Sequence, residues 1–330
     1  MDNNSSDQTA DVLLLVDGAK IVRNSDNRGF GSAVMQAVAL ASGKFLCLLN
    51  NDILLERGAL IKLLDVFCER PPTGAVGGKI VLANGQLQEV GCIIWRDGRT
   101  HQYGRGDDPT LPQYTFRRPV DYCSGALLMT PRMLFLALGG LDEQYGVGYH
   151  EDVDYCLKVW QAGKSVMYEP RAVIHHYEGA SSDSLLAIHD TLLRNHGHFT
   201  SLWSTALRLR RVEQPENVCR ARIFDSTGVP RQLYFIDQSG ISMMRSKCSE
   251  LRRTSATAIV TCILLPDVDS VTLRSEFSID VELRSFDTMS TEEVQAYCDG
   301  ADLIVISVNR PLSYAMTELA DMYSAKANLL

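Results

Sequence analysis

Long hydrophobic runs are missing from this sequence of 330 residues. The longest, such as Met133–Leu138 and Ala258–Leu265, are far shorter than the roughly 20 apolar residues of a membrane-spanning helix. The first residues, Met1–Asp7, are polar and acidic, without the basic and apolar regions of a secretory signal peptide. Glycine (24) and proline (11) are too few for a collagen-like or low-complexity chain. These absences predict a globular chain with neither a spanning helix nor a secretory leader.

An excess of positive charge is also absent, because the 40 Asp and Glu residues outnumber the 32 Lys and Arg residues and give a net charge of −8. A whole chain that coats nucleic acid needs a basic footprint, so we expect no nucleic-acid partner. None of the nine cysteines forms a C-x-x-C pair, which excludes a zinc ribbon. Several, such as Cys47 and Cys262, lie in apolar runs and are typical of core residues in a reducing compartment. We therefore expect a cytoplasmic location.

Strands and helices alternate along the chain, which predicts an α/β fold with a mainly parallel sheet. The apolar run Lys44–Leu49 suits a strand that is buried on both faces. Glu151–Ala162 is the clearest helix, because its apolar residues share one face and Gly163 follows them. Residues 97–118 are rich in Gly, Pro, Asp and Arg and predict a long loop. Other expected elements are strands at Ala19–Arg23, Ala75–Leu82, Cys92–Trp95, Ser165–Tyr168 and Ala172–His175, and helices at Gly29–Ala41 and Arg57–Cys68.

A charged segment containing Pro215 predicts a linker at residues 207–218, between domains at 1–206 and 219–330. Its Arg208, Arg210 and Arg211 favour either a solvated linker or contact with the inner, anionic face of a membrane. After this linker the α/β pattern restarts. The residues Ser-Thr-Glu-Glu, which begin at Ser290, predict the start of a helix. The expected strands are Gln232–Ile236, Ala258–Leu265, Val281–Arg284 and Asp302–Val308, with a last helix at Leu312–Ala325. This second unit is predicted to be a partial Rossmann-like domain.

Asn50-Asn51-Asp52 directly follows the apolar strand at Lys44–Leu49. Open α/β sheets bind ligands at the carboxyl ends of their strands, and carboxylate oxygens suit Mg²⁺ or Mn²⁺. The alternative is a polar turn that caps the next helix.

Two further segments carry candidate chemistry. His150-Glu151-Asp152-Val153-Asp154 opens a helix, and its carboxylates either include a general base or only complement the helix dipole. His175 and His176 follow a strand, and one of them can ligate a metal as a neutral imidazole. The alternative for each histidine is an ordinary core or surface position.

In their order and spacing, five segments together resemble the family 2 glycosyltransferases of GT-A fold, particularly the rhamnosyltransferase-like branch. Asp2–Asp7 resembles the family's Asp-Asn-x-Ser-x-Asp segment, and Asn27–Phe30 resembles its Asn-x-Gly-Phe motif. Leu49–Asp52 resembles its version of the Asp-x-Asp metal motif. Glu151–Asp154 resembles the acidic motif that holds the catalytic base, and His176–Ser181 resembles the His-x-x-Gly-x-Ser segment.

The resemblance implies an inverting transfer of a sugar from a nucleoside-diphosphate sugar to a hydroxyl of a glycan or lipid-linked acceptor, in surface polysaccharide synthesis. A divalent cation, Mg²⁺ or Mn²⁺, would be held by Asp52 and His176, with His175 as the alternative ligand. Asp152 would be the catalytic base, next to Glu151 in the same acidic motif, and Asp154 is the alternative base. The residues implied to bind the donor are Asp2, Asn27, Gly29, Asn50 and Asn51.

The sequence departs from the family pattern at its start, because the family's first strand-helix-strand unit does not precede Asp2. This predicts a GT-A domain that is incomplete at its N-terminus, with an open strand edge. A truncated, inactive sugar-nucleotide-binding or interaction module and a sugar-nucleotide nucleotidyltransferase are therefore kept as alternatives. Residues 219–330 more loosely resemble the N-terminal half of a GT-B glycosyltransferase, and a plain Rossmann-like scaffold or docking module fits them equally well.

Overall fold

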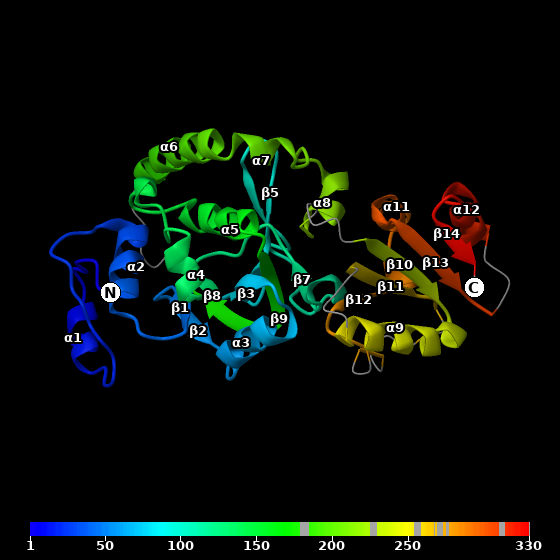
Figure 1. Ribbon diagram of the computed structural model, residues 1–330, viewed down its shortest axis with the longest axis horizontal. Coiled ribbons are helices and arrows are strands. Elements are labelled where there is room, and N and C mark those ends of the chain that lie inside the picture. The colour runs from blue at the N-terminus through cyan, green and yellow to red at the C-terminus, as the bar shows by residue number, and fades with distance from the viewer. Residues whose placement is uncertain are drawn as a thin grey trace.

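The computed structural model describes residues 1–178, 185–224, 230–253, 259–266, 268, 273–274, 277–309 and 314–329. Two α/β units follow one another, each with its own sheet and its own apolar core (Figure 1). This confirms the predicted α/β class. Of the predicted segments, Gly179–Ser181, Ala258, Leu312 and Ser313 lie outside the described residues.

The first sheet is mixed, with the strand order β1-β8-β3-β9-β2. The two long central strands, β3 and β9, are parallel, and the other pairs within this sheet are antiparallel. The short strands β4 and β7 pair with β3 and β9. Two strands expected at 165–168 and 172–175 form the single strand β9, which has an irregular register opposite Gly78 and Lys79. The bounds are β1 Phe45–Leu49, β2 Ile53–Leu55, β3 Thr73–Leu82, β4 Leu87–Glu89, β7 Arg118–Pro119, β8 Leu127–Pro131 and β9 Ser165–His176.

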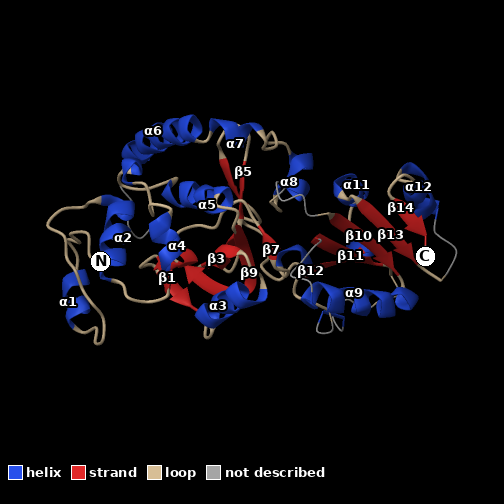
Figure 2. Ribbon diagram, in the orientation of Figure 1, coloured by secondary structure: helices blue, strands red, loops and turns tan. Residues whose placement is uncertain are grey.

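Helices cover both faces of this sheet (Figure 2). On one face lies α3, whose Leu63 and Val66 pack against Ile80 and Ile174 of the sheet. On the other face lies α5, whose apolar side joins a larger core that Phe199 of α6 completes. The apolar spacing that predicted α2, α3 and α5 is therefore the spacing of their buried faces. The bounds are α2 Gly29–Leu40, α3 Ala59–Glu69, α4 Arg132–Ala137, η2 Glu143–Tyr145, α5 Glu151–Gln161 and α6 Leu185–Leu202.

Three local expectations for this unit are wrong. Strand β1 is not buried on both faces, because it ends the strand order among the described residues and only alternate side chains, Leu46 and Leu48, are buried. Residues 97–118 are not a simple loop, because β6 (Thr100–Gln102) pairs with β5 (Cys92–Ile94), and η1 (Pro112–Tyr114) and β7 follow. Residues 19–23 make a single bridge, between Asp2 and Arg23, after the exposed helix α1 (Thr9–Leu14).

The second sheet is entirely parallel, with the order β12-β11-β10-β13-β14. Helix α9 packs on one face, and α11 and α12 pack on the other, which is a doubly wound arrangement (Figure 2). Ser290 forms the capping box that its sequence predicts. The bounds are β10 Arg231–Ile236, η3 Gln238–Gly240, α9 Ile241–Arg253, β11 Ile259–Leu264, β12 Val281–Ser285, η4 Phe286–Thr288, α11 Thr291–Gly300, β13 Leu303–Ser307, α12 Tyr314–Met322 and β14 Ala327–Leu329.

The expected linker carries two short helices, α7 (Ser204–Arg208) and α8 (Pro215–Ala221). Arg222, directly after α8, is buried and joins the units, because its guanidinium bonds Tyr103 of the first unit and Glu282 of the second. The exact domain boundaries at 206 and 219 stay predictions. Within the described residues, no helix has the length and apolar character to cross a membrane.

Candidate functional site

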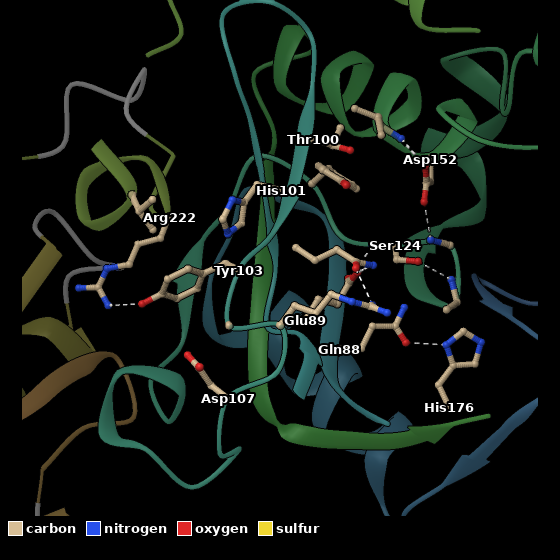
Figure 3. Close-up of a pocket in the computed structure, with 18 of the residues that line it drawn as sticks. Gln88, Glu89, Thr100, His101, Tyr103, Asp107, Ser124, Asp152, His176 and Arg222 are labelled. Carbon is tan, nitrogen blue, oxygen red and sulfur yellow. Dashed lines mark hydrogen bonds between the residues drawn. The ribbon is translucent and has the colours of Figure 1, made fainter. Parts of the chain in front are cut away.

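A cavity of about 1800 Å³ lies where the carboxyl ends of β1 and β9 meet the start of α5 (Figure 3). The β5–β6 hairpin forms part of its wall, and α8 and α11 close it from the side of the second unit. Six of the nine predicted site residues line this cavity, and they come from three separate parts of the sequence: Asn50, Asn51, Asp52, Glu151, Asp152 and His176.

Asp52 and His176 face each other across the cavity floor. Antiparallel pairing of β2 with β9 sets Ile53 opposite His176, and the Tyr177 N–H donates to the Asp52 carbonyl. This register places the His176 Nε2 atom 2.9 Å from the Asp52 Oδ1 atom. The other ring nitrogen, Nδ1, lies 2.6 Å from the Gln88 Oε1 atom, as Figure 3 shows. Gln88 Oε1 and Asp52 Oδ1 are both acceptors, so each ring nitrogen faces an oxygen to which it can donate. A cation held by Asp52 would take the Nε2 lone pair in place of that proton, with Nδ1–H still donating to Gln88.

This pair has the chemistry of a site for a hard divalent cation. One imidazole nitrogen and one carboxylate oxygen are present, and no group of three His, Cys, Asp or Glu side chains forms a metal cluster in the described part of the chain. Mg²⁺ and related ions often take one or two protein ligands and fill their other positions with water and phosphate oxygens. His175 points elsewhere, toward Glu56, so the structure favours His176 over the alternative ligand.

Asp152 stands in the first turn of α5 and is half-buried at the cavity wall. Its Oδ2 accepts a hydrogen bond of 2.9 Å from the Gly125 N–H, and its Oδ1 accepts one from the Val153 N–H. Burial raises the pKa of this carboxyl, although the backbone donors oppose the effect. The result is a fixed carboxylate whose basicity is above that of a solvated aspartate.

The two neighbouring acids have different surroundings. Glu151 is buried, and its Oε2 has no hydrogen-bond partner among the described residues. Burial, and then the charge of the adjacent Asp152, raise the pKa of Glu151 above its ordinary value. Asp154 is fully buried outside the cavity, bonded to Trp203 and paired with Lys158, so it has no access to an acceptor and is the weaker candidate for the base.

The turn before α5 is held in an unusual backbone conformation. Tyr149 and His150 both have positive φ, 74° and 77°. The Asn195 side chain of α6 donates to the carbonyls of Tyr145, Gly148 and Tyr149 and so fixes this turn. Non-glycine residues in this region cost free energy, and such strain gathers at functional sites. Here it directs the first turn of α5 into the cavity.

The structure does not bring Asp2, Asn27 and Gly29 into the cavity lining. Asp2 is buried, accepts from the Ser5 N–H and pairs with Arg23, which holds the N-terminal segment together. Asn27 caps the start of α2 by accepting from the Gly29 N–H. Each has a structural task in this arrangement, and a role in donor binding stays a prediction.

Backbone conformation and a close neighbour together restrict position 29 to glycine. Its φ is +80°, and an added Cβ would lie 2.1 Å from the Gly146 carbonyl oxygen. We expect Gly29→Ala to lower the free energy of unfolding by about 2 kcal/mol or more, because positive φ alone costs roughly 1–2 kcal/mol and the contact adds to it. Urea denaturation measures the loss. The matched control is Gly18→Ala, where φ is +74° and nothing lies within 4 Å. Equal losses in both variants would contradict the argument.

Other lining residues gave no signal in the sequence. Gln88 and Glu89 lie on the three-residue strand β4, which is too short to show a periodicity. Glu89 is 1% exposed, and burial raises its pKa to about 7. Tyr103 sits on the hairpin that was expected to be a loop, and Arg222 sits in the expected second domain. A single Gln, Glu or Tyr between apolar residues is indistinguishable from an ordinary core position before the chain is folded.

The charge of the lining is mostly negative. Nine carboxylates line the cavity, against three arginines, Arg105, Arg222 and Arg284, and no lysine among the described lining residues. Each arginine is already paired with a carboxylate, of Glu178, Glu282 and Glu293 respectively. An anionic ligand therefore needs an added cation to bind here. The carboxylates are Asp52, Glu89, Asp107, Glu151, Asp152, Glu178, Glu216, Glu292 and Glu293.

Comparison with known proteins agrees with the motifs. Residues 1–116 match the family described as "Glycosyl transferase family 2". The chain is 29% identical over 160 residues to the pre-mycofactocin glycosyltransferase of Mycobacterium tuberculosis, with 48% of this chain and 32% of the relative covered. It is 26% identical over 206 residues to that organism's N-acetylglucosaminyl-diphospho-decaprenol L-rhamnosyltransferase, covering 55% and 66%.

A third relative is the O-antigen biosynthesis protein RfbC of Myxococcus xanthus, which is 28% identical over 155 residues, with 44% of this chain and 12% of the relative covered. The chain thus spans between 12% and 66% of the length of these relatives. The matched family segment contains the Asn50–Asp52 motif, and the match to the rhamnosyltransferase covers more of the chain than the family segment does. Residues 1–116 therefore belong to glycosyl transferase family 2.

Proposed function

We propose that this chain transfers a sugar from a nucleoside-diphosphate sugar to a hydroxyl of a glycan or lipid-linked acceptor, with inversion, and that it requires a divalent cation. One observation carries the proposal: Asp52, His176 and Asp152, from distant segments, line the same cavity. The family of residues 1–116 and the printed names of the relatives, which act in glycan synthesis, support it.

The residues present fit a cation. His176 Nε2 lies beside the Asp52 carboxylate, and Gln88, the partner of Nδ1, fixes the ring. Asp52 and His176 would hold the ion, which, when bound, would neutralise the diphosphate and the charge that develops on it as the sugar departs. A diphosphate needs such a cation in this cavity, because the lining is mostly negative and its three arginines are already paired with carboxylates.

The chain's own groups supply the rest of the reaction. Asp152 would accept the proton of the acceptor hydroxyl at its carboxylate while that oxygen attacks the anomeric carbon. The Gly125 N–H orients this carboxylate by a hydrogen bond, and the turn at Tyr149 and His150 fixes the start of α5, which carries it. Glu151, whose pKa is raised by burial, would in its protonated form donate a hydrogen bond to a sugar hydroxyl in the same cavity. Inversion follows if attack and departure take place on opposite faces of the sugar.

The experiment is a thermal unfolding series with UDP, dTDP and GDP, each with Mn²⁺ or with EDTA. A nucleotide at 100 times its dissociation constant stabilises by about 2.7 kcal/mol, which is a shift of several degrees. We expect one nucleotide to shift the midpoint in Mn²⁺ and not in EDTA, and Asp52→Ala to lose the shift. Asp65→Ala, an exposed aspartate of α3 outside the cavity, is the matched control.

Turnover is then measured as release of the nucleoside diphosphate from the corresponding sugar nucleotides. No nucleotide-dependent shift in Mn²⁺ would contradict donor binding by this chain. Binding without release, with any acceptor, would favour an inactive sugar-nucleotide-binding module. Release of pyrophosphate from a nucleoside triphosphate and a sugar 1-phosphate would instead identify a nucleotidyltransferase.

A further inference from the structure

One short turn connects two carboxyl groups at the cavity wall, those of the buried Glu89 and the half-buried Asp152. The Ser124 N–H donates to Glu89 Oε1 at 3.1 Å, and the next amide, the Gly125 N–H, donates to Asp152 Oδ2 at 2.9 Å. Figure 3 shows Glu89, Ser124 and Asp152 side by side in this order. The same turn reaches the metal motif, because the Ala126 carbonyl accepts from the Asn50 N–H. Residues 124–126 thus link Glu89, the proposed base and the segment before Asp52.

Space around this turn is limited, so its position is set by these contacts. A Cβ added at Gly125 would lie 3.3 Å from the Phe30 ring and 3.7 Å from the Asp152 Cβ. Glu89 anchors the opposite side, since it is 1% exposed and its Oε2 accepts from the Gln102 Nε2 of the β5–β6 hairpin at 3.4 Å. A shift of the Glu89 carboxylate would therefore be transmitted through Ser124 and Gly125 to Asp152.

We propose that Glu89 is a positioning residue of this centre, which holds the Ser124–Gly125 turn that orients Asp152. The inference rests on the proposed function, because it concerns the base of that reaction. Glu89 belongs to neither the metal pair nor the acidic motif, and its role is to act through Asp152.

The surroundings of Glu89 make Asp152 its main charged neighbour. Facing Glu89 are Cys92 of β5, Tyr122 and Cys123 before β8, and Cys156 of α5, and burial raises the pKa of each so that all stay neutral below pH 9. Asp152 repels the ionised form of Glu89 and adds to the effect of burial, which raises the pKa of Glu89 to about 7. Repulsion by Asp152 is a smaller effect than burial, and Asp152 also raises the pKa of its neighbour Glu151, so the link from Glu89 to Asp152 is the hydrogen-bonded turn.

The test compares kcat and KM for the wild type, Glu89→Gln and Glu89→Leu. In Glu89→Gln the amide oxygen still accepts from Ser124, so the turn keeps its position. We expect kcat of this variant to stay close to that of the wild type. Glu89→Leu, which loses the acceptor, should lower kcat by about tenfold or more at an unchanged affinity for UDP and Mn²⁺. The matched control is Glu318→Gln, an exposed glutamate of α12.

The outcomes separate this inference from the proposed function. If the wild type releases nucleoside diphosphate and folded Glu89→Leu keeps the wild-type kcat, or if Glu89→Gln loses as much kcat as Glu89→Leu does, Glu89 has no such role and the proposed function stands. If the wild type releases none, the proposed function itself fails. A loss of folding in Glu89→Leu, seen by circular dichroism, leaves the decision to Glu89→Asp, whose carboxylate is one methylene too short to reach the Ser124 N–H and should also lower kcat.

Discussion

Asp152→Asn is expected to lower kcat for sugar transfer by about 10²–10⁴-fold, the usual contribution of a positioned general base. Asparagine keeps the shape of the side chain and can still accept from the Gly125 N–H, but it cannot take the proton of the acceptor hydroxyl. The affinity for nucleoside diphosphate and Mn²⁺ should stay within a factor of about two, because Asp152 lies apart from His176 in the cavity wall (Figure 3), and His176 is the residue that contacts Asp52. Steady-state kinetics and calorimetry measure the two effects separately.

Asp154→Asn is the matched control, two residues along the same helix. Asp154 is buried against Trp203 and Lys158, so its replacement should reduce stability and leave kcat within about threefold. A large loss of kcat in Asp154→Asn, with little in Asp152→Asn, would make Asp154 the base and overturn the assignment drawn from the cavity.

Arg222→Met is expected to lower the free energy of unfolding by about 3–5 kcal/mol at neutral pH, because it leaves a buried carboxylate without its counter-charge. Arg222 bonds both oxygens of Glu282 in a fork, at 2.9 and 2.7 Å, and Glu282 is itself fully buried. The same guanidinium reaches the hydroxyls of Tyr297 and Tyr103. Denaturant titration followed by circular dichroism measures the loss.

The pH dependence of this pair has a definite sign. Burial favours the protonated form of Glu282, but the Arg222 guanidinium outweighs it and lowers the pKa of Glu282 below its ordinary value. The pair therefore stabilises the fold above the ordinary pKa of glutamate, and this contribution is lost as the pH falls through the lowered value. The double variant Arg222→Met with Glu282→Met, which buries no lone charge, should recover much of the stability. An equal loss in the single and double variants would mean that packing, and not charge, explains the effect.

Much of the fold follows from patterns within short windows of sequence. The shared apolar face of Glu151–Gln161 predicted α5, the apolar run before Asn50 predicted β1, and the Ser290 capping box predicted the start of α11. These succeed because helix periodicity and capping depend on residues that are at most a few positions apart. The pairing of β6 with β5 was missed, because the residues of β6 stand in a segment whose turn-forming and polar residues are typical of a loop.

Some residues of the candidate site were also predictable from the sequence, and others were not. The residues predicted to hold a cation and the acidic motif stand in recognisable segments of the sequence, and the structure brings Asp52, His176 and Asp152 into one cavity. Their roles stay predictions. Asp2, Asn27 and Gly29 lie outside its lining, where they organise the N-terminal segment and the start of α2. Whether a polar motif faces a ligand or caps a turn is decided by which elements pack beside it.

By itself, the sequence determined the α/β class, the strong helices and strands, and the chemical groups available for metal binding and proton transfer. Those properties depend on local spacing and on the identity of side chains. Only the tertiary structure decided which carboxyl groups are solvated and which are buried: Glu89 and Glu151 acquire raised pKa values from burial by residues far away in the chain. Desolvation and like-charge repulsion exist only after distant segments have packed together, and for this reason a local pattern cannot reveal them.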